Sequence, residues 1–165
     1  MATIQKITPC LWFDGQAEEA AKFYVGIFDK SRIHRMSHYT QEGQDVHGRQ
    51  PGSVMAVDFE LAGQSFTALN GGSQFRFNEA ISLQVMCDTQ DEIDRFWSKL
   101  TAGGSPDAQM CGWLKDKFGV SWQIVPKVLP ELIGDSDPAK AGRVMKALLQ
   151  MKRLDIAALK KAYSG

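Results

Sequence analysis

The stretch 111–126, with sequence CGWLKDKFGVSWQIVP, predicts a β-hairpin around which the rest of the fold is organised. Residues 112–114 form one arm, residues 116–119 the turn and residues 120–125 the return arm. Gly119 suits the last turn position because glycine adopts positive φ without steric cost. Apolar and polar residues alternate along the return arm, so one face is apolar and the other polar. The apolar face carries Val120, Trp122 and Ile124, and the polar face carries Ser121 and Gln123.

The composition is typical of a soluble globular protein. The 165 residues are 44% hydrophobic and 23% charged, enough for one domain or two small fused modules. The 19 basic residues balance the 19 acidic ones, which argues against nucleic acid or an anionic membrane as a partner. No apolar run approaches the ~20 residues that span a bilayer. The first residues show no secretory signal pattern, so we expect a cytoplasmic protein with reduced thiols at Cys10, Cys87 and Cys111.

The first half of the chain predicts a strand, a helix and three further strands. The strand covers 4–13, the amphipathic helix 16–28 and the next strand 31–39. The polar, Gly-rich residues 40–52 predict a mobile loop. Two strands at 53–61 and 64–70 follow, joined by Ala62 and Gly63 as a two-residue hairpin turn, and residues 71–78 form a linker.

The same order of elements then repeats. It comprises a strand at 80–87, a helix from the N-cap Thr89 to about Leu100, a short strand near Gln109, and the hairpin. A shift of 73 residues superposes Glu19 on Glu92 and Phe23 on Phe96. We therefore predict an α+β fold of two tandem βαβββ modules with curved mixed sheets. The modules cover 1–78 and 79–127, and a C-terminal helical extension covers 128–165.

The C-terminal extension predicts a helical turn at 128–133 and two helices at 139–151 and 154–163. Asp137 and Pro138 form an N-cap followed by proline at the first helical position. The apolar stripe of the longer helix needs a partner, either the outer face of a sheet or a second subunit.

Three segments resemble one known family: LNGG at 69–72, the hairpin stretch 111–126, and MKRLDIAALKKA at 151–162. They resemble the PhnB-like group of the vicinal oxygen chelate superfamily, which includes glyoxalase I, bleomycin-resistance proteins and extradiol dioxygenases. Sequences of this group often carry the label 3-demethylubiquinone-9 3-methyltransferase domain. The resemblance covers nearly the whole chain. It implies that each sheet forms a half-open cup with its helix outside, that the cups hold the site, and that the protein is a homodimer.

Alternation along the strands assigns side chains to the cup. Ile81, Leu83 and Val85 should pack under the helices, and Asp58 should pair with Thr67 across the Ala62–Gly63 turn. We expect ligand-binding roles for Cys10, Trp12, Thr67, Gln84, Trp113 and Gln123, with stacking from Phe75 and Phe77. Asp58 is the candidate general base. Cys10 has no evident histidine to activate it, so we expect it to be a small structural residue.

Metal chemistry is not expected in the cup. The resemblance places the metal ligands of metal-dependent relatives at Ser82 and Gln123, near Thr8, and at Thr67. None of these side chains is the imidazole, carboxylate or thiolate that a divalent metal prefers. His34 and His38 would lie ~13 Å apart on a strand, too far to share an ion. We therefore predict no metal and no cofactor.

Three functional hypotheses remain open. The first is metal-independent binding of a small, partly aromatic molecule in the cup. The second is a metal-independent lyase or isomerase that uses Asp58 as its base, and the third is a dimerisation or scaffold module without a ligand. Methyl transfer has no support in the residues, because GGSQF at 71–75 opens a linker and not the Gly-rich strand-to-helix turn typical of methyl-donor sites.

Overall fold

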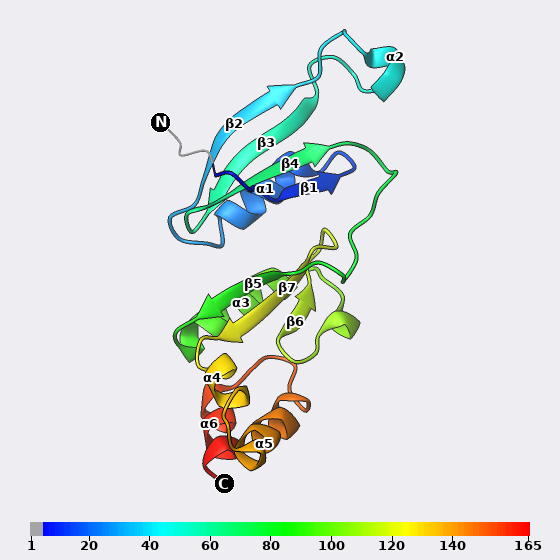
Figure 1. The fold of residues 1–165 in the computed structure, drawn as a ribbon. Helices are drawn as coiled ribbons and strands as arrows, with labels where there is room; N and C mark the ends of the chain where they lie inside the picture. Colours follow the sequence, from blue (N-terminus) through cyan, green and yellow to red (C-terminus); the bar gives the residue numbers. More distant parts are fainter. Residues whose placement is uncertain (1–4) are drawn as a thin grey trace. The chain divides into compact units, whose positions relative to one another are not determined.

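A computed structural model describes residues 5–165 of the protein (Figure 1). The chain divides into two compact units, one ending at Phe77 and the other beginning at Asn78. Sheets and helices are both present, which confirms the α+β class. Within residues 5–165, every helix is too short or too polar to cross a lipid bilayer.

The first unit contains a mixed four-stranded sheet in the order β1-β4-β3-β2. Its strands are β1 (Cys10–Phe13), β2 (Arg32–His38), β3 (Val54–Leu61) and β4 (Gln64–Asn70). β1 runs parallel to β4, and the other neighbours are antiparallel. Ala62 and Gly63 both have positive φ, at 47° and 88°, which confirms the predicted turn.

Helix α1 (Ala17–Val25) covers one face of this sheet. Ala17, Ala20 and Ala21 are fully buried, and their small side chains let the helix approach the sheet closely. The strand residues on this face are also buried: Val57, Phe59, Leu61, Phe66 and Ala68. The opposite face of the sheet, called the open face below, carries side chains that are only partly buried, among them Asp58, Glu60 and Thr67. A short helix, α2 (Gln44–His47), lies within the loop between β2 and β3.

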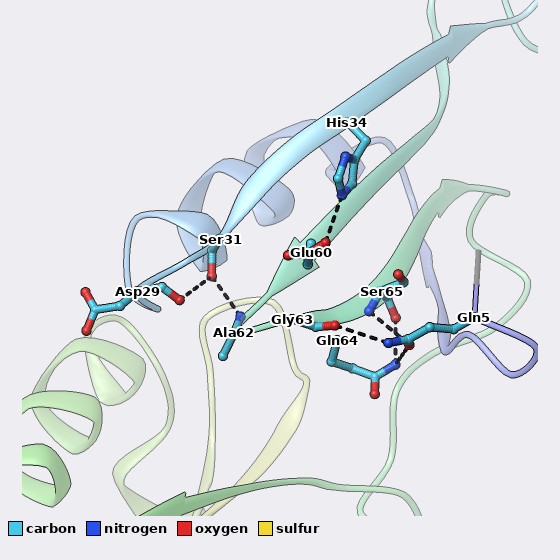
Figure 2. A network of polar contacts seen from close by, with 9 residues as sticks. All are labelled: Gln5, Asp29, Ser31, His34, Glu60, Ala62, Gly63, Gln64 and Ser65. Carbon is cyan, nitrogen blue, oxygen red and sulfur yellow. Dashed lines mark hydrogen bonds and ion pairs between the residues drawn. The ribbon is translucent and has the colours of Figure 1, made fainter. Parts of the chain in front are cut away.

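Side-chain hydrogen bonds hold the chain on both sides of the β3–β4 turn (Figure 2). Ser31 accepts the backbone N–H of Ala62 and donates to the Asp29 carbonyl. Gln5 donates to the Gly63 carbonyl and accepts the backbone N–H of Ser65. The predicted strand at 4–13 is shorter than expected, because Gln5 binds the turn and β1 starts only at Cys10. Residues 1–4 lie outside the described part.

The second unit contains a three-stranded sheet in the order β5-β7-β6. Its strands are β5 (Leu83–Cys87), β6 (Trp113–Lys115) and β7 (Ser121–Pro126). β5 runs parallel to β7 and β6 pairs antiparallel with β7, which repeats the β1-β4-β3 arrangement of the first unit. The two tandem modules are thus consistent with the predicted duplication.

The second module has one strand fewer than predicted. Near Gln109 the chain forms a 3₁₀ turn, Pro106–Ala108, and then a single β-bridge between Met110 and Trp113. Cys111 has a φ of 52°, and its backbone N–H donates to the Met151 carbonyl, so the chain leaves the extended conformation here. The expected burial of Ile81 is also wrong: β5 begins only at Leu83, and Ile81 is exposed.

Helix α3 (Gln90–Thr101) covers the second sheet through Ile93, Phe96 and Leu100. The Thr89 hydroxyl accepts the Glu92 backbone N–H, which confirms the predicted N-cap. The Glu92 carboxylate accepts the N–H of Asp88 and so satisfies a further donor at the start of the helix.

The helices α4 (Leu129–Ile133), α5 (Pro138–Leu148) and α6 (Ile156–Ser164) pack together at the end of the second unit (Figure 1). Asp137 caps α5 by accepting the Ala139 N–H, as predicted. The three helices share an apolar core with the end of β7: Val125, Leu129, Leu132, Val144, Leu148, Leu154 and Leu159. The apolar stripe of α5 therefore faces α4 and α6.

Candidate functional site

A row of four side chains, called the polar row below, crosses the open face of the first sheet and consists of Cys10, Thr67, Asp58 and Arg35. The strand register places Cys10 opposite Thr67, Thr67 opposite Asp58, and Asp58 opposite Arg35. Each strand of the sheet supplies one member. Three of the four, Cys10, Thr67 and Asp58, are predicted site residues, and the structure brings them together as the hairpin pattern required.

Asp58 is the hydrogen-bond acceptor at the centre of this row. Its Oδ2 accepts from Nε and Nη2 of Arg35, at 3.2 and 2.8 Å, and its Oδ1 accepts from the Thr67 hydroxyl at 3.0 Å. The Arg35 side chain is 76% exposed and that of Asp58 is 35% exposed. Both carboxylate oxygens are thus occupied, and the guanidinium presents its remaining N–H groups to solvent.

Strict alternation along β2 does not identify Arg35 as a site residue. A register shift between Ile33 and Arg35 forms a β-bulge that inserts His34. His34 lies 3.3 Å from the Glu60 carboxylate while its neighbour Arg35 binds Asp58, so adjacent residues contact carboxylates on one face of β3. Bulges redirect side chains in this way, but a register irregularity is not visible in a hydrophobic pattern.

Cys10 is exposed at the end of the row. Partial burial of the thiol, reinforced by the negative charge of Asp58, raises the pKa of Cys10. The thiol therefore stays neutral at physiological pH. This agrees with the expectation that Cys10 is not an activated nucleophile.

An aromatic pair lies at the end of β1. The Trp12 ring meets the Phe75 ring edge-on, with centroids 4.9 Å apart, and Phe75 is 63% exposed. The indole N–H of Trp12 donates to the Gly72 carbonyl at 2.8 Å. Phe77 differs from the expectation, because its ring packs against the buried Phe13 and extends the core of the first unit.

The LNGG segment positions this pair and the start of α1. The Asn70 side chain accepts the Ala17 N–H and donates to the Val54 carbonyl. A Cβ on Gly71 would lie 2.3 Å from the Trp12 ring, so only glycine leaves room for the indole. The motif that carries the family resemblance therefore has a local structural purpose.

A second row crosses the open face of the second sheet. The register places Gln84 opposite Gln123 and Gln123 opposite Trp113. The Gln123 amide donates to the Ser82 hydroxyl at 2.8 Å, and the amides of Gln84 and Gln123 are 3.4 Å apart. These three predicted ligand-binding residues lie together, on a different unit from Cys10, Trp12, Asp58 and Thr67.

The residues at the positions that metal-dependent relatives use do not fit a divalent metal. The hydroxyl of Thr67 donates to Asp58, and the amide of Gln123 donates to Ser82, so both are already hydrogen-bonded and neither is an anionic or imidazole ligand. Within the described part of the chain, no three His, Cys, Asp or Glu side chains are grouped for metal binding.

The model of the 3-demethylubiquinone-9 3-methyltransferase family matches residues 5–125. The chain belongs to this PhnB-like family of the vicinal oxygen chelate superfamily. Its fold is accordingly the glyoxalase-like, cup-type fold.

Solved structures have a similar fold. The PhnB protein from Bacillus cereus is 39% identical, with a TM-score of 0.64 over 74% of this chain and 99% of that one. A protein from Pseudomonas aeruginosa is 19% identical, with a TM-score of 0.58 over 75% of this chain and 98% of that one. The fosfomycin resistance protein FosX from Mesorhizobium loti is 14% identical, with a TM-score of 0.51 over 76% and 92% of the two chains, and shows the fold alone. No curated protein matches the sequence.

Proposed function

We propose that this PhnB-like protein binds a small, partly aromatic molecule on the open face of its sheets, without a metal. The observation that carries this proposal is the aromatic pair Trp12–Phe75 on the first unit. Trp12 lies on β1, the strand that also carries Cys10 of the polar row. Exposed aromatic rings supply stacking surface, and a few polar groups fix the orientation of a ligand.

The polar row would recognise hydrogen-bonding or anionic groups of such a ligand. The exposed guanidinium of Arg35 is already oriented by Asp58, so little conformational entropy is lost when a ligand binds it. On the second unit, Gln84, Gln123 and Trp113 supply amide and aromatic contacts of the same kind.

The test is a thermal-shift screen of small aromatic compounds. The Kd of each stabilising compound is then measured for variants of the protein. We expect stabilisation by at least one compound, and a Kd about ten-fold weaker in Trp12→Ala, because a lost ring contact is worth about 0.5–1.5 kcal/mol. Trp97→Ala is the matched control, since Trp97 lies on the outer helix α3. A broad screen without a stabilising compound, or equal losses in both variants, would refute the proposal.

Metal-independent catalysis with Asp58 as base is the second candidate. Asp58 is favoured because it is a carboxylate in the polar row, but both its oxygens already accept hydrogen bonds. A substrate would have to displace Arg35 or Thr67 before Asp58 could take its proton. Asp58→Asn separates the candidates: binding that survives with turnover lost supports catalysis, and an unchanged activity excludes Asp58 as the base.

We also propose that the chain forms a homodimer. Large hydrophobic side chains remain exposed in the single chain, among them Ile7, Ile81 and Met110. Association of two copies would remove some of these side chains from water. Light scattering should give twice the chain mass of 18.3 kDa, whereas a monomer mass at micromolar concentration would contradict the dimer.

A further inference from the structure

The row on the second sheet continues beyond β6 to a residue that the sequence did not identify as a site residue. Met110 forms a β-bridge with Trp113, which itself lies opposite Gln123, so the three side chains share the open face. Met110 is 61% exposed and has the place in this row that Arg35 has in the polar row of the first unit. The second row therefore consists of Gln84, Gln123, Trp113 and Met110.

A tight turn fixes the Met110 end of the second row. The backbones of Met110 and Trp113 exchange two hydrogen bonds, at 3.1 and 2.7 Å. Between them, Cys111 and Gly112 have φ angles of 52° and 84°, the positive angles of a two-residue hairpin turn. The N–H groups of these two turn residues donate at 2.8 and 2.7 Å to carbonyls of the segment between α5 and α6, beyond the residues that the family model matches. The backbone that carries the Met110 and Trp113 side chains is thus positioned before a ligand arrives.

The second row differs in charge from the polar row. The polar row contains the ion pair Arg35–Asp58, whereas none of the four side chains of the second row is charged. Lys115, which shares the face of Trp113 on β6, is paired with the Glu79 carboxylate. An ionic ligand would lose water on this row without gaining an opposite charge from its four side chains, which is unfavourable. The row therefore favours an uncharged ligand.

The exposed Gln84 amide has hydrogen-bonding groups left for a ligand. Its Nε2 lies 3.4 Å from Oε1 of Gln123, which engages one of its two N–H groups, and its own Oε1 accepts no hydrogen bond from residues 5–165. A ligand carboxamide carries the complementary donor and acceptor. An aromatic ring attached to that carboxamide has two partners at the other end of the row, the Trp113 indole and the Met110 thioether, because sulfur also makes favourable contacts with rings.

We propose that the second row binds an uncharged aromatic carboxamide, with Met110 as a further contact residue. The carboxamide pairs with the Gln84 amide, and the ring lies over Gln123 against Trp113 and Met110. Gln84 and Trp113 are two strand spacings apart, about 10 Å, a span that suits one ring with its amide group. This inference rests on the proposed function and names the ligand class of the second unit.

The test compares three probes of similar size and shape that differ in charge: benzamide, benzoate and benzamidinium. NMR at neutral pH follows the side-chain amide signals of Gln84 and Gln123 and the methyl signal of Met110, with each probe up to roughly 20 mM, well above the millimolar affinity of a weak site. We expect saturable shifts with benzamide and a Kd at least about three-fold weaker for both ions. No saturable shift with benzamide, or equal or tighter binding of either ion, would overturn the inference.

The outcomes separate this inference from the proposed function. Tighter binding of benzoate or benzamidinium at the same signals refutes an uncharged ligand but supports small-molecule binding on the open face. The thermal-shift screen with Trp12→Ala tests the proposed function on the first unit, without any residue of the second row.

Variants test the individual side chains. Gln84→Glu places a carboxylate in the row and should make benzamidinium the tightest of the three probes. Gln50→Glu makes the same change at an exposed residue of the first unit and should leave each Kd within about two-fold. Met110→Ala should weaken benzamide binding at least about three-fold, whereas Met145→Ala removes an exposed methionine from α5 and should leave it unchanged. An unchanged order of the probes in Gln84→Glu, or an unchanged benzamide Kd in Met110→Ala, would contradict the proposed contacts.

Discussion

The three cysteines of this protein differ in environment and should differ in reactivity. Cys10 is exposed at the end of the polar row, whereas Cys87 is buried and its pKa is raised to about 12 by burial and by Glu92 and Asp88. Burial and Asp58 also raise the pKa of Cys10. A raised thiol pKa means that the reactive thiolate forms only at higher pH.

We therefore expect alkylation of Cys10 by iodoacetamide to be slow at pH 7 and still rising above pH 9. Asp58→Asn removes a negative charge beside the thiol, so it should shift the pH–rate profile of Cys10 to lower pH. Peptide mapping by mass spectrometry measures both, and Cys87 should stay unmodified as the internal control. A profile that does not move in Asp58→Asn would contradict the electrostatic link.

Replacing glycine by alanine should lower the stability of the protein at one position and raise it at another. Gly71→Ala places a methyl group against the Trp12 ring and should destabilise the protein by about 1–3 kcal/mol. Gly142→Ala lies within α5, where a Cβ meets no atom within 4 Å, and should stabilise it by about 0.5–1 kcal/mol. Urea unfolding measures both changes, and a displaced Trp12 indole signal by NMR should accompany only the first.

The β6–β7 hairpin depends on one buried carboxylate in its turn. Asp116 is 3% exposed; its Oδ1 accepts the N–H groups of Phe118 and Val120, and its Oδ2 accepts the Trp122 indole N–H at 2.8 Å. Gly119 has a φ of 89°, as its predicted place in the turn requires. The side chain thus joins the turn to the buried face of the return strand.

Asp116→Ala should destabilise the protein by roughly 3 kcal/mol, because it leaves a buried indole N–H and two turn amides without their acceptor. Asp107→Ala is the matched control, since Asp107 is exposed in the neighbouring 3₁₀ turn and its loss should change stability by less than about 0.5 kcal/mol. Chemical denaturation compares the two. Similar denaturation midpoints for the two variants would show that the Asp116 carboxylate does not stabilise the turn.

Over the full chain, the C-terminal helices belong to the core of the second unit. The backbone N–H groups of Cys111 and Gly112 donate to the carbonyls of Met151 and Lys152, and Gln90 binds the backbone of Leu154 and Ile156. The segment between α5 and α6 is therefore bonded both to the start of the hairpin and to α3. These contacts argue that the helices support the hairpin and are not an independent appendage.

Leu154→Ala should accordingly destabilise the second unit by about 2–5 kcal/mol, because Leu154 is fully buried among the helices and beside Gly112. Leu149→Ala removes the same atoms from a side chain that is 59% exposed and should change stability by less than about 0.5 kcal/mol. Hydrogen exchange should show the loss of protection reaching β6 in the first variant. Loss confined to α5 and α6 would mean that the helices do not support the hairpin.

Local patterns in the sequence were sufficient to predict the hairpins and the helix caps. The repeated order of these patterns predicted the duplication. The Ala62–Gly63 turn, the Thr89 and Asp137 caps and the pairing of Asp58 with Thr67 all follow from contacts within about ten residues. Such contacts depend on backbone geometry and side-chain type, which a single sequence displays. The residues predicted for each open face therefore lie together in the structure.

Contacts between distant residues required the folded chain. Trp12 reaches Gly72 across 60 positions, and the bulge at His34 brings Arg35 to Asp58. Just after Gln109, where a strand was predicted, the backbone instead donates hydrogen bonds to the segment between α5 and α6. A pocket in the first unit, lined by Arg49 and Tyr39 among others, likewise assembles from the start of α1, the ends of β2 and β4, the start of β3 and the loop before it. Register, bulges and cavities arise from how the elements pack against one another, and no local pattern of hydrophobicity encodes that packing.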